Sequence, residues 1–403
     1  MVLVVGVWSW AYGGNMDLDE LSTVPHAMFH NPTPRILDGF GMAAVQHDGD
    51  VLIGSPYALH AGRDTGLAYL FDQQGRVLHT FENPFVTPGA LFGQAVALTK
   101  QHVIIGAPHA RDTVGTQTGA AYIFDRKTAT LRFTVDNPQP TSGVFGHAVV
   151  AEKNRIVIGD PQASTSSSFH TGAAYLFDET TSVLQQTFRP VADEVTHATQ
   201  FGYAVAVIGE YIFVGAPFGP AVNHDAGIVY LYHAKTGNLV RTFEPPNPSQ
   251  VSMFGWALAA NSRVLLIGAL GFHDRYREEG IAYLFDVQSG KLLHRLHNPS
   301  PTERAHFGKS VAILNDRVAV AAPGDRIQQS GKVAGGCVSI FDLTTGVLLQ
   351  TLCDPLPATG ASDLFGETLF AHGNRLVVGA PFGGTNLELD AGILYQFDMH
   401  SSP

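Results

Sequence analysis

The side chains best suited to chemistry in this chain follow directly after a recurring Phe-Gly pair. The positions after the seven pairs are Met42, Gln94, His147, Tyr203, Trp256, Lys309 and Glu367. Tyr203 and Trp256 offer aromatic faces for stacking or for cation–π contact. Lys309 and Glu367 have opposite charges and belong to successive copies, so they could form an ion pair. We interpret the seven positions as a ring around one axis that forms a ligand-binding mouth.

An acid–base pair is the second chemical arrangement that the sequence offers. Asp160 replaces a small residue in the same copy as His147, and a carboxylate beside an imidazole can orient the ring or raise its pKa. Two interpretations stay open: a pocket for a small molecule or a side chain, or a filled rim with one ion pair. If the protein is an enzyme, the candidate catalytic residues are His147, Asp160, Tyr203, Lys309 and Glu367.

No catalytic or cofactor motif accompanies these residues. The chain has no Gly-x-Ser-x-Gly elbow, phosphate-binding loop, dinucleotide fingerprint or His-Glu-x-x-His pair. We therefore expect no cofactor and favour a binding protein over an enzyme. The net charge is −11, with 24 Lys and Arg against 35 Asp and Glu and no basic run, so nucleic acid is not expected as a partner. No apolar stretch approaches the roughly 18 residues of a membrane helix, so we expect no membrane insertion.

The elements that would position this ring recur with a nearly fixed period. The pairs begin at Phe40, Phe92, Phe145, Phe201, Phe254, Phe307 and Phe365, so successive copies lie 52 to 58 residues apart. Such a period indicates one supersecondary unit that is repeated and stacked. Copies that bury their faces against each other form a single domain, even in a chain of 403 residues.

Each copy contains four short apolar runs. In the second copy these are Phe92–Leu98, Val103–Gly106, Ala120–Phe124 and Leu131–Val135, each bounded by turn residues. The runs do not alternate with polar residues, which predicts a sheet that is buried on both faces. An all-β, seven-bladed β-propeller with four antiparallel strands in each blade fits this pattern. Phe-Gly would begin the innermost strand, where small residues let neighbouring blades approach.

The N-terminal segment is predicted to close the ring. No fourth strand follows Phe397, while the ending Phe81-Glu82-Asn83-Pro84 of a fourth strand reappears early in the chain as Phe29-His30-Asn31-Pro32. An N-terminal strand would therefore complete the last blade and remove two open sheet edges. The domains expected are an extension at 1–23, a propeller at 24–398 and a tail at 399–403. The extension has no early Lys or Arg, which favours an extra strand over a signal-peptide remnant.

Each copy combines two short sequence words, Phe-Gly and, after the second predicted strand, Gly-Ala-Pro or a variant of it. These words resemble the FG-GAP repeats of integrin alpha chains and of bacterial secreted or surface proteins. The second word of the repeat stands as Gly106-Ala107-Pro108, Gly215-Ala216-Pro217, Gly379-Ala380-Pro381 and, with one change, Ala321-Ala322-Pro323. The departures are Gly54-Ser55-Pro56, Gly159-Asp160-Pro161 and Gly268-Ala269-Leu270. The resemblance covers about residues 24–398 and implies a seven-bladed propeller. It also favours an extracellular or periplasmic location. In integrins the matching ring is aromatic and receives a basic side chain from a partner, whereas this ring is mixed.

The resemblance also raises the question of calcium. Integrin-type repeats often bind it in the link between the first and second strands, but these links are short here. The closest match, His47-Asp48-Gly49-Asp50, has two carboxylates, too few for the six to eight oxygens that calcium takes. We predict no calcium in these links and no other metal site.

The two cysteines, Cys337 and Cys353, flank a predicted hairpin as near cross-strand neighbours. Their register allows a disulfide, but two buried free thiols are the favoured interpretation.

The long links between strands 2 and 3 and between strands 4 and 1 should share one end of the propeller, the loop face. Long loops on a rigid scaffold usually carry function, so we predict that this face binds a protein, glycan or small ligand. Two alternatives stay open: a lyase-like or hydrolase-like enzyme with its active site at the channel mouth, and a structural subunit of a larger complex. A fold alone does not choose among them.

Overall fold

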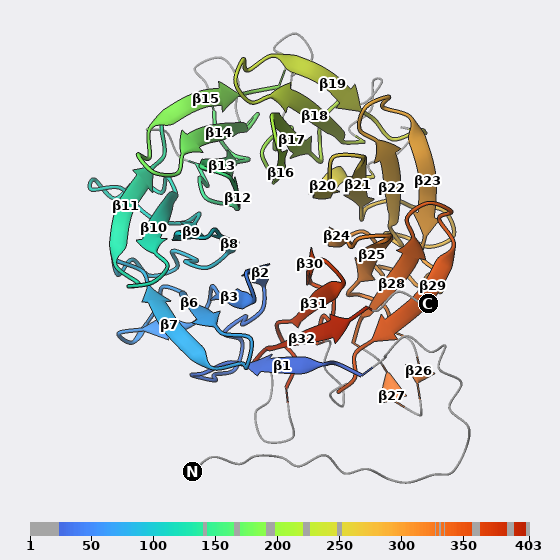
Figure 1. Cartoon of the computed structure of the whole chain (residues 1–403), viewed down its shortest axis with the longest axis horizontal. Coiled ribbons are helices and arrows are strands. Elements are labelled where there is room, and N and C mark those ends of the chain that lie inside the picture. The colour runs from blue at the N-terminus through green and yellow to red at the C-terminus, as the bar shows by residue number, and fades with distance from the viewer. Residues whose placement is uncertain are drawn as a thin grey trace.

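The chain forms a ring of seven β-sheets around a central axis (Figure 1). A computed structural model describes residues 24–139, 143–164, 170–190, 198–220, 226–247, 252–326, 335–356, 363–384 and 391–399, with the backbone of two short strands near residue 330. All regular elements in these residues are strands. The predicted all-β, seven-bladed propeller is confirmed, while the extension at 1–23 lies outside the described part of the chain.

Each blade is a four-stranded antiparallel sheet, numbered here by its order in the chain. Blade 1 contains β2 (Ala43–His47), β3 (Asp50–Ser55), β6 (Leu67–Phe71) and β7 (Val77–Glu82). Blade 2 contains β8 (Ala95–Leu98), β9 (His102–Ala107), β10 (Ala120–Asp125) and β11 (Leu131–Asp136). Blade 3 contains β12 (Ala148–Glu152), β13 (Arg155–Asp160), β14 (Ala173–Asp178) and β15 (Leu184–Phe188).

The remaining blades follow the same order from the axis outward. Blade 4 contains β16 (Ala204–Ile208), β17 (Tyr211–Ala216), β18 (Ile228–His233) and β19 (Leu239–Phe243). Blade 5 contains β20 (Phe254–Ala260), β21 (Val264–Ala269), β22 (Ile281–Asp286) and β23 (Leu292–His297). Blade 6 contains β24 (Val311–Ile313), β25 (Arg317–Ala322), β28 (Cys337–Asp342) and β29 (Leu348–Cys353). Blade 7 contains β30 (Thr368–His372), β31 (Arg375–Ala380), β32 (Ile393–Asp398) and β1 (Ala27–His30). Two small hairpins lie in loops: β4 (Leu59–His60) with β5 (Arg63–Asp64), and β26 (Gln328–Gln329) with β27 (Lys332–Val333).

The N-terminal strand closes the ring as predicted. β1 pairs with β32 in antiparallel register, from Ala27 opposite Gln396 to His30 opposite Ile393 (Figure 1). Blade 7 is thus built from the two ends of the chain, and hydrogen bonds between β1 and β32 within this blade close the ring.

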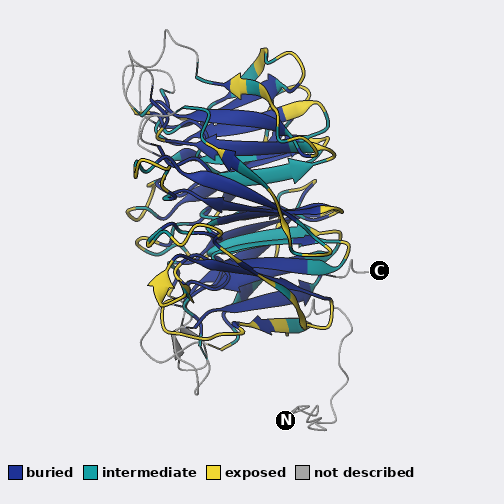
Figure 2. Cartoon of the chain, turned by 90° about the vertical axis from the view of Figure 1, so that its left-hand side faces the viewer, coloured by how far each residue is buried: buried dark blue, intermediate teal, exposed yellow. Residues whose placement is uncertain are grey.

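The second and third strands of each blade are buried on both faces (Figure 2). Every residue of β6 and β9, for example, is buried. All seven phenylalanines of the Phe-Gly pairs have no exposed surface. Each packs on aromatic rings of its own blade; in blade 2 the ring centroids of Phe92 and Tyr122 are 5.7 Å apart. The lack of alternation in the sequence is explained, because neighbouring blades cover both faces of each sheet.

The glycines of the two repeat words meet between adjacent blades. Gly93 has a φ of 94°, and its N–H donates to the carbonyl of Gly106 in the same blade at 3.0 Å. A Cβ on Gly106 would lie 2.1 Å from the carbonyl oxygen of Gly146, the Phe-Gly glycine of the next blade. The two words are therefore two sides of one contact between blades, where a side chain cannot fit.

The first strand begins later than predicted in every blade except blade 5, where β20 begins at Phe254. The sequence predicts a strand over Phe92–Leu98, whereas β8 begins at Ala95. The N–H of Gln94 instead donates to the carbonyl of Leu91 at 3.0 Å. Phe-Gly thus forms a turn that leads into the strand, and the positive φ of Gly93 is incompatible with regular pairing there.

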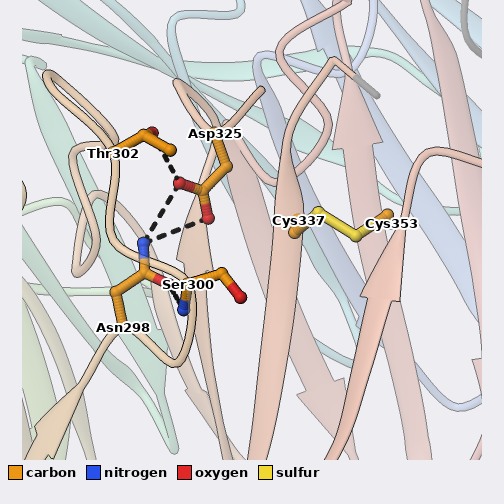
Figure 3. The surroundings of a disulfide bond; sticks show 6 residues. All are labelled: Asn298, Ser300, Thr302, Asp325, Cys337 and Cys353. Carbon is orange, nitrogen blue, oxygen red and sulfur yellow. Dashed lines mark hydrogen bonds between the residues drawn. A yellow bond between two sulfur atoms is a disulfide. The ribbon is translucent and has the colours of Figure 1, made fainter. Parts of the chain in front are cut away.

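An Asn-Pro turn after the fourth strand links neighbouring blades. After blade 5, the Asn298 amide donates to both carboxylate oxygens of Asp325 in blade 6 at 3.1 Å, and Asn298 Oδ1 accepts the N–H of Ser300 at 3.0 Å (Figure 3). The Thr302 hydroxyl donates to the same carboxylate at 3.0 Å. Burial raises the pKa of Asp325 to about 6, although these hydrogen bonds oppose the shift. The same Asn-to-Asp bond joins Asn31 to Asp38 at 3.0 Å.

The two cysteines form a disulfide between β28 and β29, with Cα atoms 4.1 Å apart (Figure 3). They are directly opposite partners in the strand register. The predicted cross-strand neighbourhood is confirmed, and the preference for two free thiols is wrong. A directly opposite pair on neighbouring strands brings the two sulfur atoms within bonding distance. The sequence spacing does not determine the strand register to within one residue, so it could not show that the cysteines are directly opposite.

Candidate functional site

A repeated turn places the residue that follows each Phe-Gly pair. In all seven copies the N–H of this residue donates to the carbonyl three positions earlier, at 2.9 to 3.2 Å. Examples are His147 to Val144 at 3.1 Å and Glu367 to Leu364 at 2.9 Å. All seven side chains have intermediate exposure at the inner end of their blades. The position directly after each Phe-Gly pair, which defined the predicted ring, therefore has the same backbone geometry in all seven blades.

Five of the seven side chains touch one another in succession across blades 3 to 7. The ring centroids of His147 and Tyr203 are 4.7 Å apart, and those of Tyr203 and Trp256 are 4.3 Å apart. Lys309 Nζ lies 5.5 Å from the centroid of Trp256 and 2.8 Å from Glu367 Oε1. We call these five residues the channel-mouth arc. The anticipated ion pair is present, and the cation of that pair also lies within cation–π distance of the indole.

Met42 and Gln94 hold the same backbone position but not the same contacts. No hydrogen bond, ion pair or ring contact between described residues connects either side chain to the arc. Met42 instead lies against its own turn, where a Cβ on Gly39 would be 3.0 Å from its sulfur. The arc therefore occupies the side of the mouth formed by blades 3 to 7.

Burial controls the protonation of the aromatic end of the arc. Burial, with smaller effects of His109 and Lys309, lowers the pKa of His147 to about 4. Burial, with a smaller effect of Glu367, raises the pKa of Tyr203. At neutral pH His147 and Tyr203 are therefore both uncharged, and the only formal charges in the arc are those of Lys309 and Glu367.

Asp160 does not raise the pKa of His147, contrary to the sequence-based expectation. Its fully buried carboxylate accepts hydrogen bonds from the Asn137 amide at 2.8 Å and from the N–H groups of Val144 and Gln162 at 2.9 and 3.2 Å. Asp160 is thus the acceptor of the Asn-Pro turn that leaves blade 2. This explains why a carboxylate replaces the small residue at this position, and it removes Asp160 from the arc.

A cavity of about 600 Å³ adjoins the charged end of the arc. It is lined by Glu303, Arg304, His306, Lys309, Pro323, Gly324, Arg326, Leu364 and Glu367. The lining comes from the 2–3 link of blade 6 and from the 4–1 links on either side of that blade. In this part of the ring the two kinds of long link therefore share one end, the loop face. We call this space the arc cavity.

Sequence reasoning missed the cationic rim of this cavity. Arg304 and His306 approach Glu278 at 3.7 and 3.5 Å, and Arg326 is exposed at the cavity. The other blades do not have basic residues at the positions that match Arg304 and His306, so the Phe-Gly repeat gave no signal for them. The cluster of basic residues just before Phe307 was the available sequence clue.

The described residues hold no group of three or more His, Cys, Asp and Glu side chains arranged to bind a metal. In the first 1–2 link, Asp50 Oδ2 lies 2.7 Å from the Arg126 guanidinium of the next blade. Its carboxylate therefore already has a cationic partner. The absence of calcium from these links stays a prediction.

A comparison with known families identifies one copy of the repeat. Residues 86–124 match the family model described as FG-GAP repeat. This segment includes both words of the second copy, Phe92-Gly93 and Gly106-Ala107-Pro108, and it spans β8 to most of β10. No curated protein gives a significant match to the chain. Among the described residues no helix is long and apolar enough to cross a membrane.

Proposed function

The chain is a seven-bladed β-propeller with an FG-GAP repeat in its second blade, and from this premise we propose that it is a binding module. Its site is the channel-mouth arc together with the arc cavity, on the loop face. The ligand is a polar or acidic group presented by a protein, a glycan or a small molecule. The observation that carries this proposal is the unbroken series of contacts from His147 to Glu367.

The geometry of Lys309 limits the chemistry of the ligand. Its ammonium group already lies over Trp256 and pairs with Glu367, so an incoming cation would have to displace it. A hydroxyl or carboxylate can instead bind to Lys309 and Arg326 at the cavity without such a displacement. The cavity volume of about 600 Å³ falls within the range of small-ligand sites. These features favour a sugar-sized or side-chain-sized polar group over the basic side chain that integrin propellers receive.

The protonation states support binding over catalysis. An enzyme at this mouth would need an acid–base residue that titrates near the working pH. His147 has a pKa of about 4, and no carboxylate among the described residues is hydrogen-bonded to it, since Asp160 is engaged in an Asn-Pro turn. The structural-subunit alternative differs in its prediction, because it requires a permanent partner over the loop face and a larger mass in solution.

The disulfide supports a location outside the reducing cytosol. Cys337 and Cys353 are joined within blade 6, and such bonds persist mainly in oxidising compartments. We therefore propose an extracellular or periplasmic setting, in which glycans and surface proteins are accessible ligands.

A glycan array and a thermal-shift screen of small polar molecules test this function. A ligand of the arc should bind the Trp256→Ala protein about tenfold more weakly, because stacking and cation–π contacts contribute about 1 kcal/mol or more. Tyr203→Ala should have a similar effect. Tyr211→Ala is the matched control, because Tyr211 belongs to the same blade but begins β17 at the opposite end of the sheet. Ligands that respond equally to Tyr203→Ala and Tyr211→Ala would contradict the proposal.

A further inference from the structure

The Asn-Pro turn that follows the fourth strand has an acidic variant after blade 6. Three of these turns place an asparagine amide against a buried carboxylate at 2.8 to 3.1 Å: Asn31 with Asp38, Asn137 with Asp160, and Asn298 with Asp325. After blade 6 the sequence is instead Asp354-Pro355. A carboxylate therefore stands where the repeat has an amide, and nothing in the proposed binding function uses it.

Asp354 makes the same turn as the asparagines. Its Oδ1 accepts the N–H of Leu356 at 2.9 Å, as Oδ1 of Asn31 accepts the N–H of Thr33 at 3.0 Å. Because the same bond holds both side chains, Oδ2 of Asp354 occupies the place of the amide nitrogen. Asp354 is 4% exposed, and its Oδ2 has no hydrogen-bond partner among the described residues.

Asp363 occupies the place of the carboxylate that the amide contacts. It lies two residues before the last Phe-Gly pair, as Asp38 lies two residues before the first. The carbonyl of Asp363 accepts the N–H of Phe382 at 3.4 Å, and that of Asp38 accepts the N–H of the matching Tyr57 at 3.1 Å. Both aspartates are buried. The two acidic residues that follow blade 6 therefore correspond to an Asn–Asp pair.

A glycine pair and a tyrosine bring the two carboxylates together. The N–H of Asp354 donates to the carbonyl of Gly336 at 3.3 Å, and a Cβ on Gly335 would lie 3.3 Å from the Cβ of Asp363. Burial raises the pKa of the Tyr395 hydroxyl, with smaller effects from the charges of Asp354 and Asp363 and from its contact with Asp354. Both carboxylates therefore lie beside this hydroxyl, between blades 6 and 7.

The asparagine amide uses both of its hydrogens in the matching turns. Asn31 donates one to Asp38 and the other to the carbonyl of Ala391 at 3.3 Å, and the turn after blade 2 makes the same two bonds. The carbonyl of Gly335 holds the position of Ala391, directly before the glycine that precedes the third strand. Oδ2 of Asp354 therefore faces two acceptors, and an ionised carboxylate has no hydrogen to donate.

We propose that Asp354 and Asp363 bind a calcium ion between blades 6 and 7. A proton shared by the two carboxylates would replace only one amide hydrogen, whereas a cation contacts both carboxylates and the Gly335 carbonyl. A divalent ion also neutralises the two negative charges. Magnesium usually keeps several waters, while calcium binds carboxylate and carbonyl oxygens directly, which suits a buried pair.

The ligand set reaches the lower end of the calcium range. Two oxygens from each carboxylate, one from the Gly335 carbonyl and one from the Tyr395 hydroxyl can supply about six ligands. The sequence predicts no metal site because these residues follow no metal-binding motif, and their match to an Asn–Asp pair is visible only in the structure. The site lies in the 4–1 link, at the opposite end of the blade from the 1–2 links considered above.

Thermal unfolding and isothermal titration calorimetry of chelator-treated protein at pH 7, with calcium chloride as the ligand, test this site. The wild type should bind calcium saturably, and calcium at about 100 times its Kd should raise Tm by about 3 °C. Asp354→Asn restores the Asn–Asp pair of the other turns, so it should fold and lose the calcium response. Asp325→Asn is the matched control, because Asp325 is a buried carboxylate whose partner is already the Asn298 amide. It should keep the response.

A shared proton is the alternative that the same assay can identify. In that case calcium would not change Tm, and the wild type would gain stability relative to Asp354→Asn as the pH falls from about 7 to about 5. That result would overturn the proposal. Equal calcium responses in the wild type and in Asp354→Asn would overturn it as well, since the ion would then bind elsewhere.

Discussion

Removal of the disulfide is the perturbation whose magnitude follows most directly from the structure. Cys337 and Cys353 are separated by 16 positions and lie opposite each other in a hairpin that forms the outer half of blade 6. Loop-closure entropy gives about 3 kcal/mol for a cross-link of this length. We expect Cys337→Ala/Cys353→Ala to lose about that much unfolding free energy, because the cross-link no longer restricts the unfolded chain.

Calorimetry can measure this loss. Unfolding entropies near 2.1 cal/mol/K per residue imply a decrease in Tm of about 4 °C for a propeller of this size. Wild-type protein in reductant should approach the variant, and the variant itself should not respond to reductant. Alkylation after denaturation without reductant should modify no cysteine in the wild type. Two alkylated cysteines in that sample, together with an unchanged Tm in the variant, would refute the reasoning and restore the free-thiol interpretation.

Three further predictions follow. Asp325 has a raised pKa of about 6, so the stability that its protonated form contributes is greatest below about pH 4 and is lost as the pH rises through 6. Urea unfolding should show that the wild type loses about 3 kcal/mol of unfolding free energy between these limits relative to Asp325→Asn. Gly106→Ala places a Cβ 2.1 Å from Gly146 O and should cost about 1–3 kcal/mol in the same assay, whereas an unchanged midpoint would contradict the glycine contact. Lys309→Met leaves the half-buried Glu367 without its cation and should cost about 1–3 kcal/mol of unfolding free energy. The double variant Lys309→Met/Glu367→Gln should regain most of this loss. A double variant no more stable than the single one would argue against the ion pair.

The repeat made the fold predictable from the sequence. Seven copies of Phe-Gly each predicted the same buried turn, and their agreement outweighed the weak signal of any single copy. Closure by β1 followed because Phe29-His30-Asn31-Pro32 carries the ending of a fourth strand without the three strands before it. The start of β8 was missed because a positive φ at Gly93 ends the pairing, and apolar periodicity does not report backbone conformation.

The candidate site could be predicted only where it follows the repeat. The Phe-Gly register identified the positions of Tyr203, Trp256 and Lys309, since one backbone turn places all of them. Their mutual contacts depend on side-chain orientation, which the register does not determine. Asp160 was assigned to the wrong partner because its neighbour comes from the preceding blade, at Asn137, and sequence adjacency pointed to His147.

The contact between His102 and Glu179 was invisible to the same reasoning for a related cause. His102 and Glu179 lie 77 positions apart and meet only because blades 2 and 3 are adjacent. Both residues lie at or beside short links, His102 after the 1–2 link of blade 2 and Glu179 in the 3–4 link of blade 3. The side chains of these links differ from blade to blade, and only the structure shows which of them meet.

The central claim is that a ligand binds at the channel-mouth arc, and Trp256 reports on it directly. It is the only tryptophan among the described residues, since Trp8 and Trp10 precede residue 24. Fluorine NMR of protein labelled with 5-fluorotryptophan, with the Trp256 signal assigned through Trp256→Phe, can follow titration of the tightest ligand from the screen. We predict a saturable shift of the Trp256 resonance that is lost in Tyr203→Ala and kept in Tyr211→Ala. Saturation of the protein without any change in the Trp256 resonance would contradict the account.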